Sequence, residues 1–158
     1  MNIPADGFPF DSTQNSKLKI KNLIEVSAGL VFRNGLLLIT KRKDDVHLGG
    51  LWEFPGGKRE RDESDEDCLR RELREELGIE VEIKELVESL RHDYPEKTVH
   101  LKFFRCTWLR HEPKPMGCAD MAWVDAAALD DYTFPEADFQ LLKTLRREPE
   151  LWKNAVVA

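Results

Sequence analysis

Residues 64–78 constrain the fold of this chain more than any other segment, because both ends and the apolar face of a helix are visible there. Ser64 can cap the first turn, with an acidic residue three positions later, and Gly78 can adopt the left-handed conformation that ends a helix. Between them, leucines recur at helical spacing: Leu69, Leu73 and Leu77. The segment therefore predicts an amphipathic helix that packs its leucine face on a core.

Segments typical of β-strands flank this helix on both sides. Residues 24–32 and 36–39 are mostly apolar, and Asn34 with Gly35 between them is typical of the tight turn of a hairpin. The remaining pattern predicts strands at 81–90, 99–104 and, in short form, 122–124, and a second helix at 136–147.

The length of 158 residues and the 41% hydrophobic content fit one globular domain. We expect that domain at residues 23–147, between an N-terminal extension without periodicity (1–22) and a C-terminal tail (148–158). No apolar stretch approaches the roughly 20 residues that span a bilayer, and the N-terminus lacks the pattern of a signal peptide. We therefore expect a cytoplasmic protein.

The net charge and the cysteines argue against duplex binding, a disulfide framework and a zinc ribbon. The net charge of -6 opposes sequence-independent binding to a nucleic-acid duplex, which depends on many Lys and Arg contacts to phosphate. Cys68, Cys106 and Cys118 are odd in number and contain no CxxC pair, which argues against a disulfide framework and against a zinc ribbon. A polyanionic ligand would need cations to help hold it.

Three carboxylates fall on one side of the predicted helix. At about 100° per residue, Glu72, Glu75 and Glu76 lie within an arc of roughly 100°. Hard oxygen ligands grouped in this way suit Mg²⁺ or Mn²⁺. Just upstream, Gly56 and Gly57 predict a loop whose backbone can approach a metal or a phosphate closely. The alternative is a solvated helix face with ordinary ion pairs at i, i+4 spacing, and the spacing alone favours that alternative.

A longer pattern favours the metal site. The segment from Gly57 to Ile79 resembles the Nudix box, G-x5-E-x7-R-E-U-x-E-E-x-G-U with U aliphatic, at every specified position. The matching residues are Gly57, Glu63, Arg71, Glu72, Leu73, Glu75, Glu76, Gly78 and Ile79. From composition alone, such a match is expected in well under about one in 100,000 chains of this length. The resemblance implies a Nudix hydrolase with an α/β fold, a mixed β-sheet sandwiched between helices.

The flanks of the box are similar to the MutT-type branch, which acts on nucleoside triphosphates, and to its relatives that act on cytidine nucleotides. The similarity covers about residues 23–146 and includes the segments 39–42, 51–58, 94–95, 99–104, 123–124 and 134–138. It implies cleavage to a nucleoside monophosphate and pyrophosphate.

Carried over by position, the resemblance assigns roles in catalysis and metal binding. It implies that Glu72, Glu75 and Glu76 bind Mg²⁺, for which Mn²⁺ can substitute, and that the Gly57 carbonyl can add a ligand. Arg71 is expected to orient the acidic cluster, and Glu63 is expected to support the metal site. Glu72 is our first choice for the general base.

One further carboxylate departs from the pattern of the branch. Asp120 stands where the branch usually carries a Glu, so that it is a candidate metal ligand with a shorter side chain. The alternative is a loop Asp that caps a turn.

The resemblance also places Arg42, His47, Phe54 and Asp138 around the nucleobase. Each has a simpler alternative: Phe54 as a core residue, His47 as a loop residue and Asp138 as the cap of the second helix. MutT has Asn at the position that matches Asp138. An ionised carboxylate only accepts hydrogen bonds, whereas an amide also donates.

We expect 8-oxo-dGTP as substrate, in the sanitation of the nucleotide pool, with CTP or a modified dCTP as the alternative. Other Nudix substrates such as ADP-ribose remain open, as does a non-catalytic MutT-like module that recognises nucleic acid. A partner-binding domain with an acidic helix would show no metal-dependent turnover. The small-molecule nucleotide is the only expected partner apart from a second copy of the chain, as monomer and homodimer are both compatible with the sequence.

Overall fold

A computed structural model describes residues 22–153 of the chain. The predicted N-terminal extension lies outside the described residues except for Asn22, and so do the last five residues of the predicted tail. No helix within the described part is long and apolar enough to cross a membrane. All three cysteines are buried and free.

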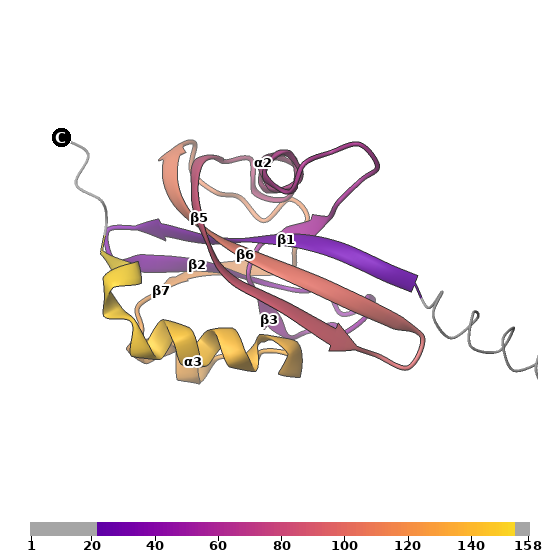
Figure 1. Ribbon diagram of the computed structural model, residues 1–158. Coiled ribbons are helices and arrows are strands. Elements are labelled where there is room, and N and C mark those ends of the chain that lie inside the picture. Colours follow the sequence, from indigo (N-terminus) through magenta and orange to yellow (C-terminus); the bar gives the residue numbers. More distant parts are fainter. Residues whose placement is uncertain (1–21, 154–158) are drawn as a thin grey trace, which may run out of the picture.

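The centre of the molecule is a mixed seven-stranded sheet, in which the strands β3, β2, β1, β6 and β5 lie in that order (Figure 1). β1 and β6 run parallel, and the other pairs are antiparallel. β7 pairs with β2, and β4 pairs with β1. The strands are β1 (Asn22–Arg33), β2 (Leu36–Lys41), β3 (Trp52–Glu53), β4 (Gly56–Lys58), β5 (Glu80–Asp93), β6 (Lys97–Arg110) and β7 (Asp120–Val124).

The predicted hairpin and the predicted first helix are confirmed. Asn34 and Gly35 join β1 to β2 with φ angles of 53° and 77°, the left-handed values that this tight turn requires. Helix α2 (Asp65–Leu77) begins after Ser64, whose side chain accepts a hydrogen bond from the Asp67 backbone N–H. It ends at Gly78, which has a φ of 69°.

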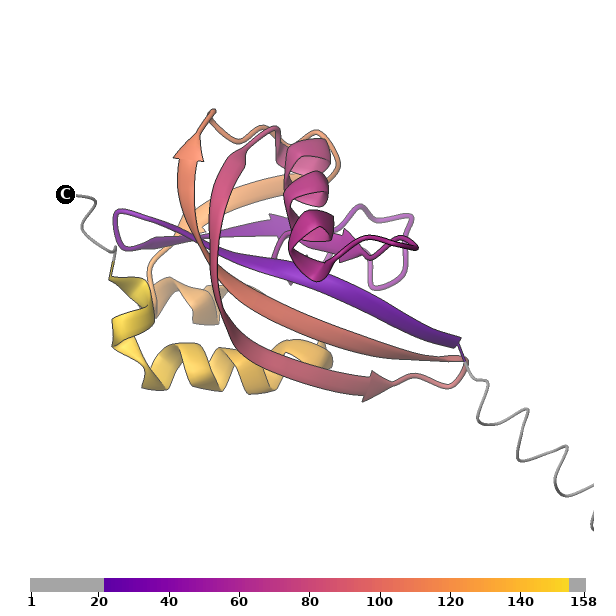
Figure 2. The ribbon, with the colours of Figure 1, turned by 45° about the horizontal axis from the view of Figure 1, so that its top comes forward.

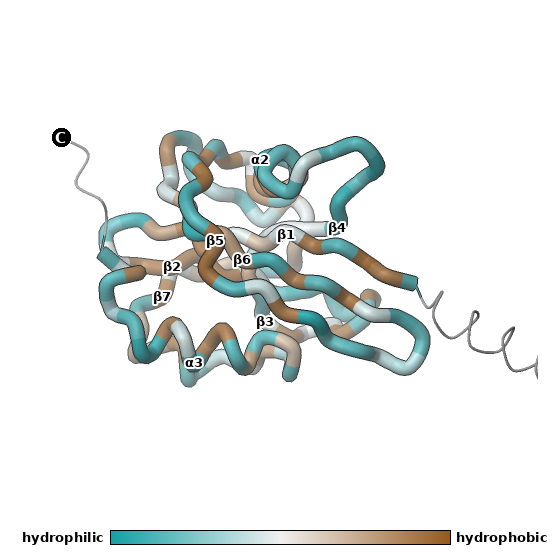
Figure 3. Tube along the Cα trace, in the orientation of Figure 1, coloured by the Kyte–Doolittle hydropathy of each residue, from teal (hydrophilic) through white to brown (hydrophobic). Residues whose placement is uncertain are grey.

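Each face of the sheet is covered by a different helix, and Figure 2 shows α2 on one side and α3 (Phe139–Arg147) on the other. Alternate residues of β1 point to opposite faces. Leu30 and Phe32 belong to the core under α3, whereas Val31 belongs to the core under α2. The loop that leads into α2 and the β5–β6 turn are hydrophilic (Figure 3). The predicted fold class, a mixed sheet between helices, is therefore confirmed.

The second helix and the glycine loop differ from the sequence prediction. Residues Glu136–Asp138 form a separate 3-10 turn, η2, before α3 begins at Phe139. Gly56 and Gly57 lie in the short strand β4, which pairs with residues 26–28 of β1. Strands of two or three residues are too short to show an alternating pattern, so neither β3 nor β4 could be read from the sequence.

Two further 3-10 helices complete the described chain, η1 (Ala127–Asp131) and η3 (Pro149–Trp152). The Trp152 ring packs edge-on against Phe32 at 5.3 Å, and its Nε1–H donates to the Leu145 carbonyl. The packed unit therefore continues to Trp152, beyond the boundary predicted at residue 147.

Candidate active site

Strand β4 brings Gly57, the first residue of the box, against the middle of α2. A Cβ atom added to Gly57 would lie 2.3 Å from Cδ of Glu72, so only glycine lets this carboxyl group stand where it does. The Cys68 thiol donates to the Gly57 carbonyl at 3.5 Å. The sequence predicted a loop whose backbone could approach a metal or a phosphate; the glycines lie instead in strand β4, and the backbone of Gly57 runs close to a carboxyl group.

Arg71 ties the acidic groups of the box together. Its Nε and Nη2 donate to both carboxylate oxygens of Glu63, at 2.8 and 2.9 Å. Its Nη1 donates to Glu72 at 3.0 Å and to Glu75 at 3.3 Å. The hydrogen bonds from Arg71 and from the Glu60 backbone lower the pKa of Glu63 to about 2. This geometry fits the predicted role of Arg71 as the residue that orients the acidic cluster, and it connects Glu63, the predicted support of the metal site, to that cluster through Arg71.

Two of the three helix carboxylates, Glu72 and Glu76, face one cavity of about 420 Å³. Burial, and then the charges of Glu53 and Glu72, raise the pKa of Glu76 to about 8. Burial also raises the pKa of Glu72, against the opposing hydrogen bond from Arg71. A cation placed between these two groups would favour their ionised forms.

Glu75 does not line this cavity. Its side chain is 60% exposed and pairs with Arg71. Glu72 and Glu76 are one helical turn apart, whereas Glu75 is rotated by about 100° from Glu76. Within residues 22–153, no three Asp, Glu, His or Cys side chains are close enough together to form a ready metal site. Of the three glutamates predicted to share one side of the helix, Glu72 and Glu76 face the cavity and Glu75 does not.

Asp120, the candidate ligand from β7, does not line the cavity either. It is exposed, and its Oδ1 accepts a hydrogen bond from the Met121 backbone N–H at 2.8 Å. A hydrogen bond to a neighbouring backbone N–H is typical of an Asp that caps a turn, so it favours the alternative role of Asp120.

The oxygen donors at this end of the cavity fit a hard divalent cation. Glu72 and Glu76 supply carboxylate oxygens, and the Gly57 backbone runs beside Glu72. Gly117 leaves room for the other carboxylate in the same way, because a Cβ atom at Gly117 would lie 3.1 Å from Cγ of Glu76. Carboxylates and backbone carbonyls are the ligands that Mg²⁺ and Mn²⁺ prefer.

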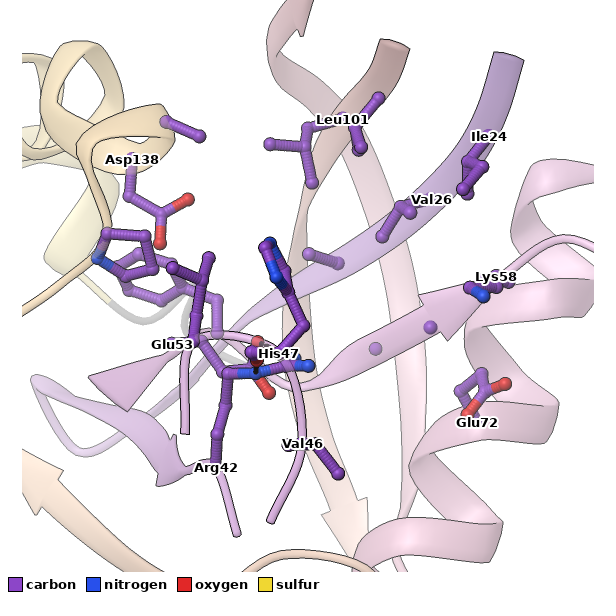
Figure 4. Close-up of a pocket in the computed structure, with 18 of the residues that line it drawn as sticks. Ile24, Val26, Arg42, Val46, His47, Glu53, Lys58, Glu72, Leu101 and Asp138 are labelled. Atoms are coloured by element: carbon purple, nitrogen blue, oxygen red, sulfur yellow. Dashed lines mark hydrogen bonds and ion pairs between the residues drawn. The ribbon is translucent and has the colours of Figure 1, made fainter. Parts of the chain in front are cut away.

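All four residues predicted around the base line the other part of the same cavity: Arg42, His47, Phe54 and Asp138. Figure 4 shows Asp138 on one side of it and Glu72 of α2 on the opposite side. Phe54 is 4% exposed and stacks on Phe134 at 5.2 Å, so it belongs to the core and also forms a wall of the cavity. The sequence had posed these two roles as alternatives.

Asp138 is only 6% exposed. It precedes α3 but its side chain makes no capping hydrogen bond, and no group within residues 22–153 forms a hydrogen bond or an ion pair with its carboxyl group. Burial, and then the charge of Glu53, raise its pKa to about 7. A buried carboxyl group without a partner that points into a cavity is available to a ligand.

Arg42 and His47 belong to the segment that connects β2 to β3. Arg42 Nε donates to the His47 carbonyl at 2.7 Å, and its Nη1 donates to Glu53 at 2.9 Å. The His47 ring meets edge-on, at 5.2 Å, the ring of Tyr94 from the turn between β5 and β6, and both residues line the cavity. Burial, followed by the charges of Lys97 and Arg42, lowers the pKa of His47.

Glu53 and Tyr94 also line the cavity, although neither was predicted from the sequence to have a role there. The signal for Glu53 was present, as it is a charged residue between Trp52 and Phe54 in an otherwise apolar segment. For Tyr94 there was no such signal, because only the fold of the β5–β6 hairpin brings it opposite His47.

Comparison with known proteins agrees with this geometry. The family model described as NUDIX domain matches residues 27–144. A CTP pyrophosphohydrolase of Escherichia coli is 36% identical over 77% of this chain and 90% of its own length. An 8-oxo-dGTP diphosphatase of Haemophilus influenzae is 35% identical over 81% of this chain and 95% of its own. The solution structure of the E. coli ORF135 protein superimposes with a TM-score of 0.73 at 32% identity, over 82% of this chain and 93% of that one.

Proposed function

The chain belongs to the Nudix family of hydrolases, and from this membership and its cavity we propose that it is a magnesium-dependent nucleoside triphosphate pyrophosphohydrolase. The reaction yields a nucleoside monophosphate and pyrophosphate, and the proposed substrate is 8-oxo-dGTP. Curated relatives with that activity in their names, such as the protein of H. influenzae, support this substrate.

One observation carries the proposal. Two carboxyl groups of the box, those of Glu72 and Glu76, share a cavity with the carboxyl group of Asp138, which has no partner among residues 22–153. Figure 4 shows Glu72 and Asp138 on opposite sides of it. A nucleotide has a polyanionic end, which needs a cation, and a base with hydrogen-bonding edges. The cavity offers a group of the required chemistry for each end.

Nudix hydrolases generally use a divalent metal, and the proposed ligands here are Glu72, Glu76 and the Gly57 carbonyl, with Glu75 and Asp120 as candidates that would have to turn inward. The bound ion would neutralise phosphate oxygens and lower the pKa of the attacking water. Glu72 would take the proton from that water, and Arg71 holds Glu72 in place. Glu63 in turn fixes the guanidinium group through two hydrogen bonds.

Base recognition would use Phe54 as an apolar wall and Asp138 as a polar edge. An oxidised guanine presents the O6 acceptor together with ring and amino N–H donors. With a pKa of about 7, Asp138 exists near neutral pH both as an acceptor and as a protonated donor. It can therefore match either kind of group on this base.

The second candidate is a cytidine nucleotide. The relative named CTP pyrophosphohydrolase supports it, and so does the ionised form of Asp138, which could accept a hydrogen bond from the cytosine amino group. This candidate requires only the acceptor form of the carboxyl group.

A nucleotide panel separates the candidates. kcat/KM would be measured with Mg²⁺ for 8-oxo-dGTP, dGTP, CTP, dCTP and ADP-ribose. The proposal expects the highest value for 8-oxo-dGTP, and a highest value for CTP or dCTP would support the second candidate. Turnover of ADP-ribose alone would contradict both, and a folded protein without metal-dependent turnover would be a binding module.

A further inference from the structure

Three polar side chains form a hydrogen-bonded chain across β5, β6 and β1, which run side by side in Figure 1. The Ser89 hydroxyl oxygen lies 2.8 Å from Nε2 of His100, and Nδ1 of His100 lies 3.1 Å from Oε1 of Glu25. One ring nitrogen is therefore engaged by a hydroxyl group and the other by a carboxylate. This order of hydroxyl, imidazole and carboxylate is the arrangement that activates a serine as a nucleophile.

The Ser89 cluster, defined as Ser89, His100 and Glu25, lies on the face of the sheet opposite to the cavity. The neighbours of Glu25 on β1 and of His100 on β6 line the cavity, and side chains alternate along a strand, so Glu25 and His100 point away from it. Their side chains are only 22% and 20% exposed, and the two residues are neighbours in the β1–β6 register. Ser89 is exposed on β5. The hydroxyl group is thus open to solvent, while the two groups behind it are held in place.

Glu25 sets the tautomer of His100. An ionised carboxylate only accepts hydrogen bonds, so Nδ1 of the neutral imidazole carries the proton and donates to Glu25. Nε2 then has a lone pair that accepts the hydrogen bond of the Ser89 O–H group. In this state His100 can take the hydroxyl proton when Ser89 attacks an electrophile.

Arg91 adds a positive charge beside Ser89. It follows two residues later on β5, so its side chain leaves the same face, and it is opposite His100 in the β5–β6 register. It is exposed and makes no hydrogen bond or ion pair with any group within residues 22–153. A guanidinium group without a partner is available to stabilise an oxyanion that develops at Ser89 and to attract an anionic substrate.

We propose that the Ser89 cluster is a hydrolytic site separate from the cavity, which cleaves activated carboxylic esters and favours those with an anionic acyl group. Ser89 Oγ attacks the acyl carbon, and its proton passes to Nε2 of His100. The bond to the leaving alcohol breaks, and the alcohol takes that proton. Water then attacks the acyl-serine with His100 as the base, which releases the carboxylic acid and restores the Ser89 hydroxyl group.

The alternative role is a clamp, in which the three side chains only hold neighbouring strands together. A clamp would contribute to stability, but it would not make Ser89 more reactive than any other exposed hydroxyl group. Acylation at Ser89 therefore separates the two roles.

The experiment uses the full chain and two 4-nitrophenyl esters, the neutral acetate and the anionic monoester of succinate. Absorbance of the released 4-nitrophenolate gives the rate, and mass spectrometry of peptides identifies the acylated residue. In the wild type the acyl group should be found on Ser89, and the succinate ester should react faster than the acetate. Ser89→Ala should lose this label, and Arg91→Gln should lose the preference for succinate.

His100→Asn should lower the rate of acylation at Ser89 by about a hundredfold or more, the size typical of a lost general base. The matched control is His111→Asn, because His111 is an exposed histidine outside the cluster and Asn tolerates its φ of 72°. This control should react like the wild type, which excludes catalysis by any exposed imidazole.

Two variants test Glu25 as a positioning residue. The amide of Glu25→Gln can donate to Nδ1 and so permits the wrong tautomer, whereas Glu25→Asp keeps a group that only accepts. The rate of acylation should fall at least about tenfold in the Gln variant and recover in part in the Asp variant. A structural role predicts instead that both rates follow the thermal stability of the variants.

The ester reaction is distinguishable from the proposed nucleotide chemistry, because EDTA should leave it unchanged. Thermal unfolding verifies which variants are folded. The proposal is overturned if Ser89 of the wild type is not acylated, or if a folded His100→Asn variant acylates Ser89 at the wild-type rate.

Discussion

The backbone of Gly57 and the carboxyl group of Glu72 occupy adjoining space so tightly that a single methyl group between them would lie 2.3 Å from Cδ of Glu72. The contact joins β4 to α2, two elements whose relative position sets the end of the cavity where Glu72 and Glu76 lie. A glutamate side chain can rotate away from a methyl group, whereas a strand cannot easily shift. A change at Gly57 should therefore disturb the catalytic geometry before it disturbs the fold.

We expect Gly57→Ala to lower kcat by about a hundredfold, because displacement of a catalytic group by about 1 Å has an effect of that size. Thermal unfolding should change little, because Glu72 is partly exposed and can yield. Gly117→Ala is the matched control, since its methyl group would meet Glu76 at a looser 3.1 Å and should cost less activity. Equal activity of Gly57→Ala and wild type would show that this contact is not needed.

Glu72→Gln should keep the fold and lower kcat by roughly a thousandfold, the size typical of a lost general base or metal ligand. The amide can still accept a hydrogen bond from Arg71, so the surrounding network is retained. Steady-state kinetics at saturating Mg²⁺ measure the effect, and a circular dichroism spectrum verifies the fold. A folded variant with unchanged turnover would remove Glu72 from the mechanism.

The pair of Arg71 and Glu63 predicts a pH dependence of stability. The pKa of Glu63 is lowered to about 2, below its value in the unfolded chain, because Arg71 favours the ionised form. Its stabilising contribution is therefore present above about pH 4.3 and is lost as the pH falls towards 2. Thermal unfolding between pH 2 and pH 6 should show a smaller acid-induced loss for Glu63→Gln than for the wild type. Parallel curves would mean that the pair contributes nothing measurable to stability.

Asp138→Asn should lower kcat/KM for the best native substrate by at least about tenfold, with smaller effects on nucleotides that carry other bases. The physical reason is that Asn cannot switch between an acceptor-only and a donor form. The preference of the wild type among 8-oxo-dGTP, dGTP, CTP and dCTP should also change between pH 6 and pH 8, through the pKa of about 7, and that of the variant should not. A uniform change for all four nucleotides would place Asp138 outside the base pocket.

The sequence predicted those parts of the fold that depend on local signals. The ends of α2 were visible because Ser64 and Gly78 have specific backbone functions there. The β1–β2 turn was visible because Asn34 and Gly35 tolerate positive φ. By contrast, β4 depends on pairing with a strand about thirty residues earlier in the chain, and no local pattern reports such a pairing.

In the candidate site too, the features with a local sequence signal were predicted, and those that depend on tertiary contacts were not. The box identified Glu72 and Glu76 because its spacing places them one helical turn apart, and the structure brings both to the cavity. The directions of Glu75 and Asp120 depend on hydrogen bonds with Arg71 and with the Met121 backbone, which the spacing does not specify.

The central claim is that Glu72 and Glu76 direct cleavage of a nucleoside triphosphate to monophosphate and pyrophosphate. It is tested most directly by identifying the products. 8-oxo-dGTP would be incubated with Mg²⁺ and either the wild type or Glu72→Gln, and the products separated and weighed by mass spectrometry. We predict 8-oxo-dGMP and pyrophosphate in equal amounts from the wild type, at roughly a thousand times the rate of the variant. The diphosphate with orthophosphate, or the same products at the same rate from Glu72→Gln, would contradict the account.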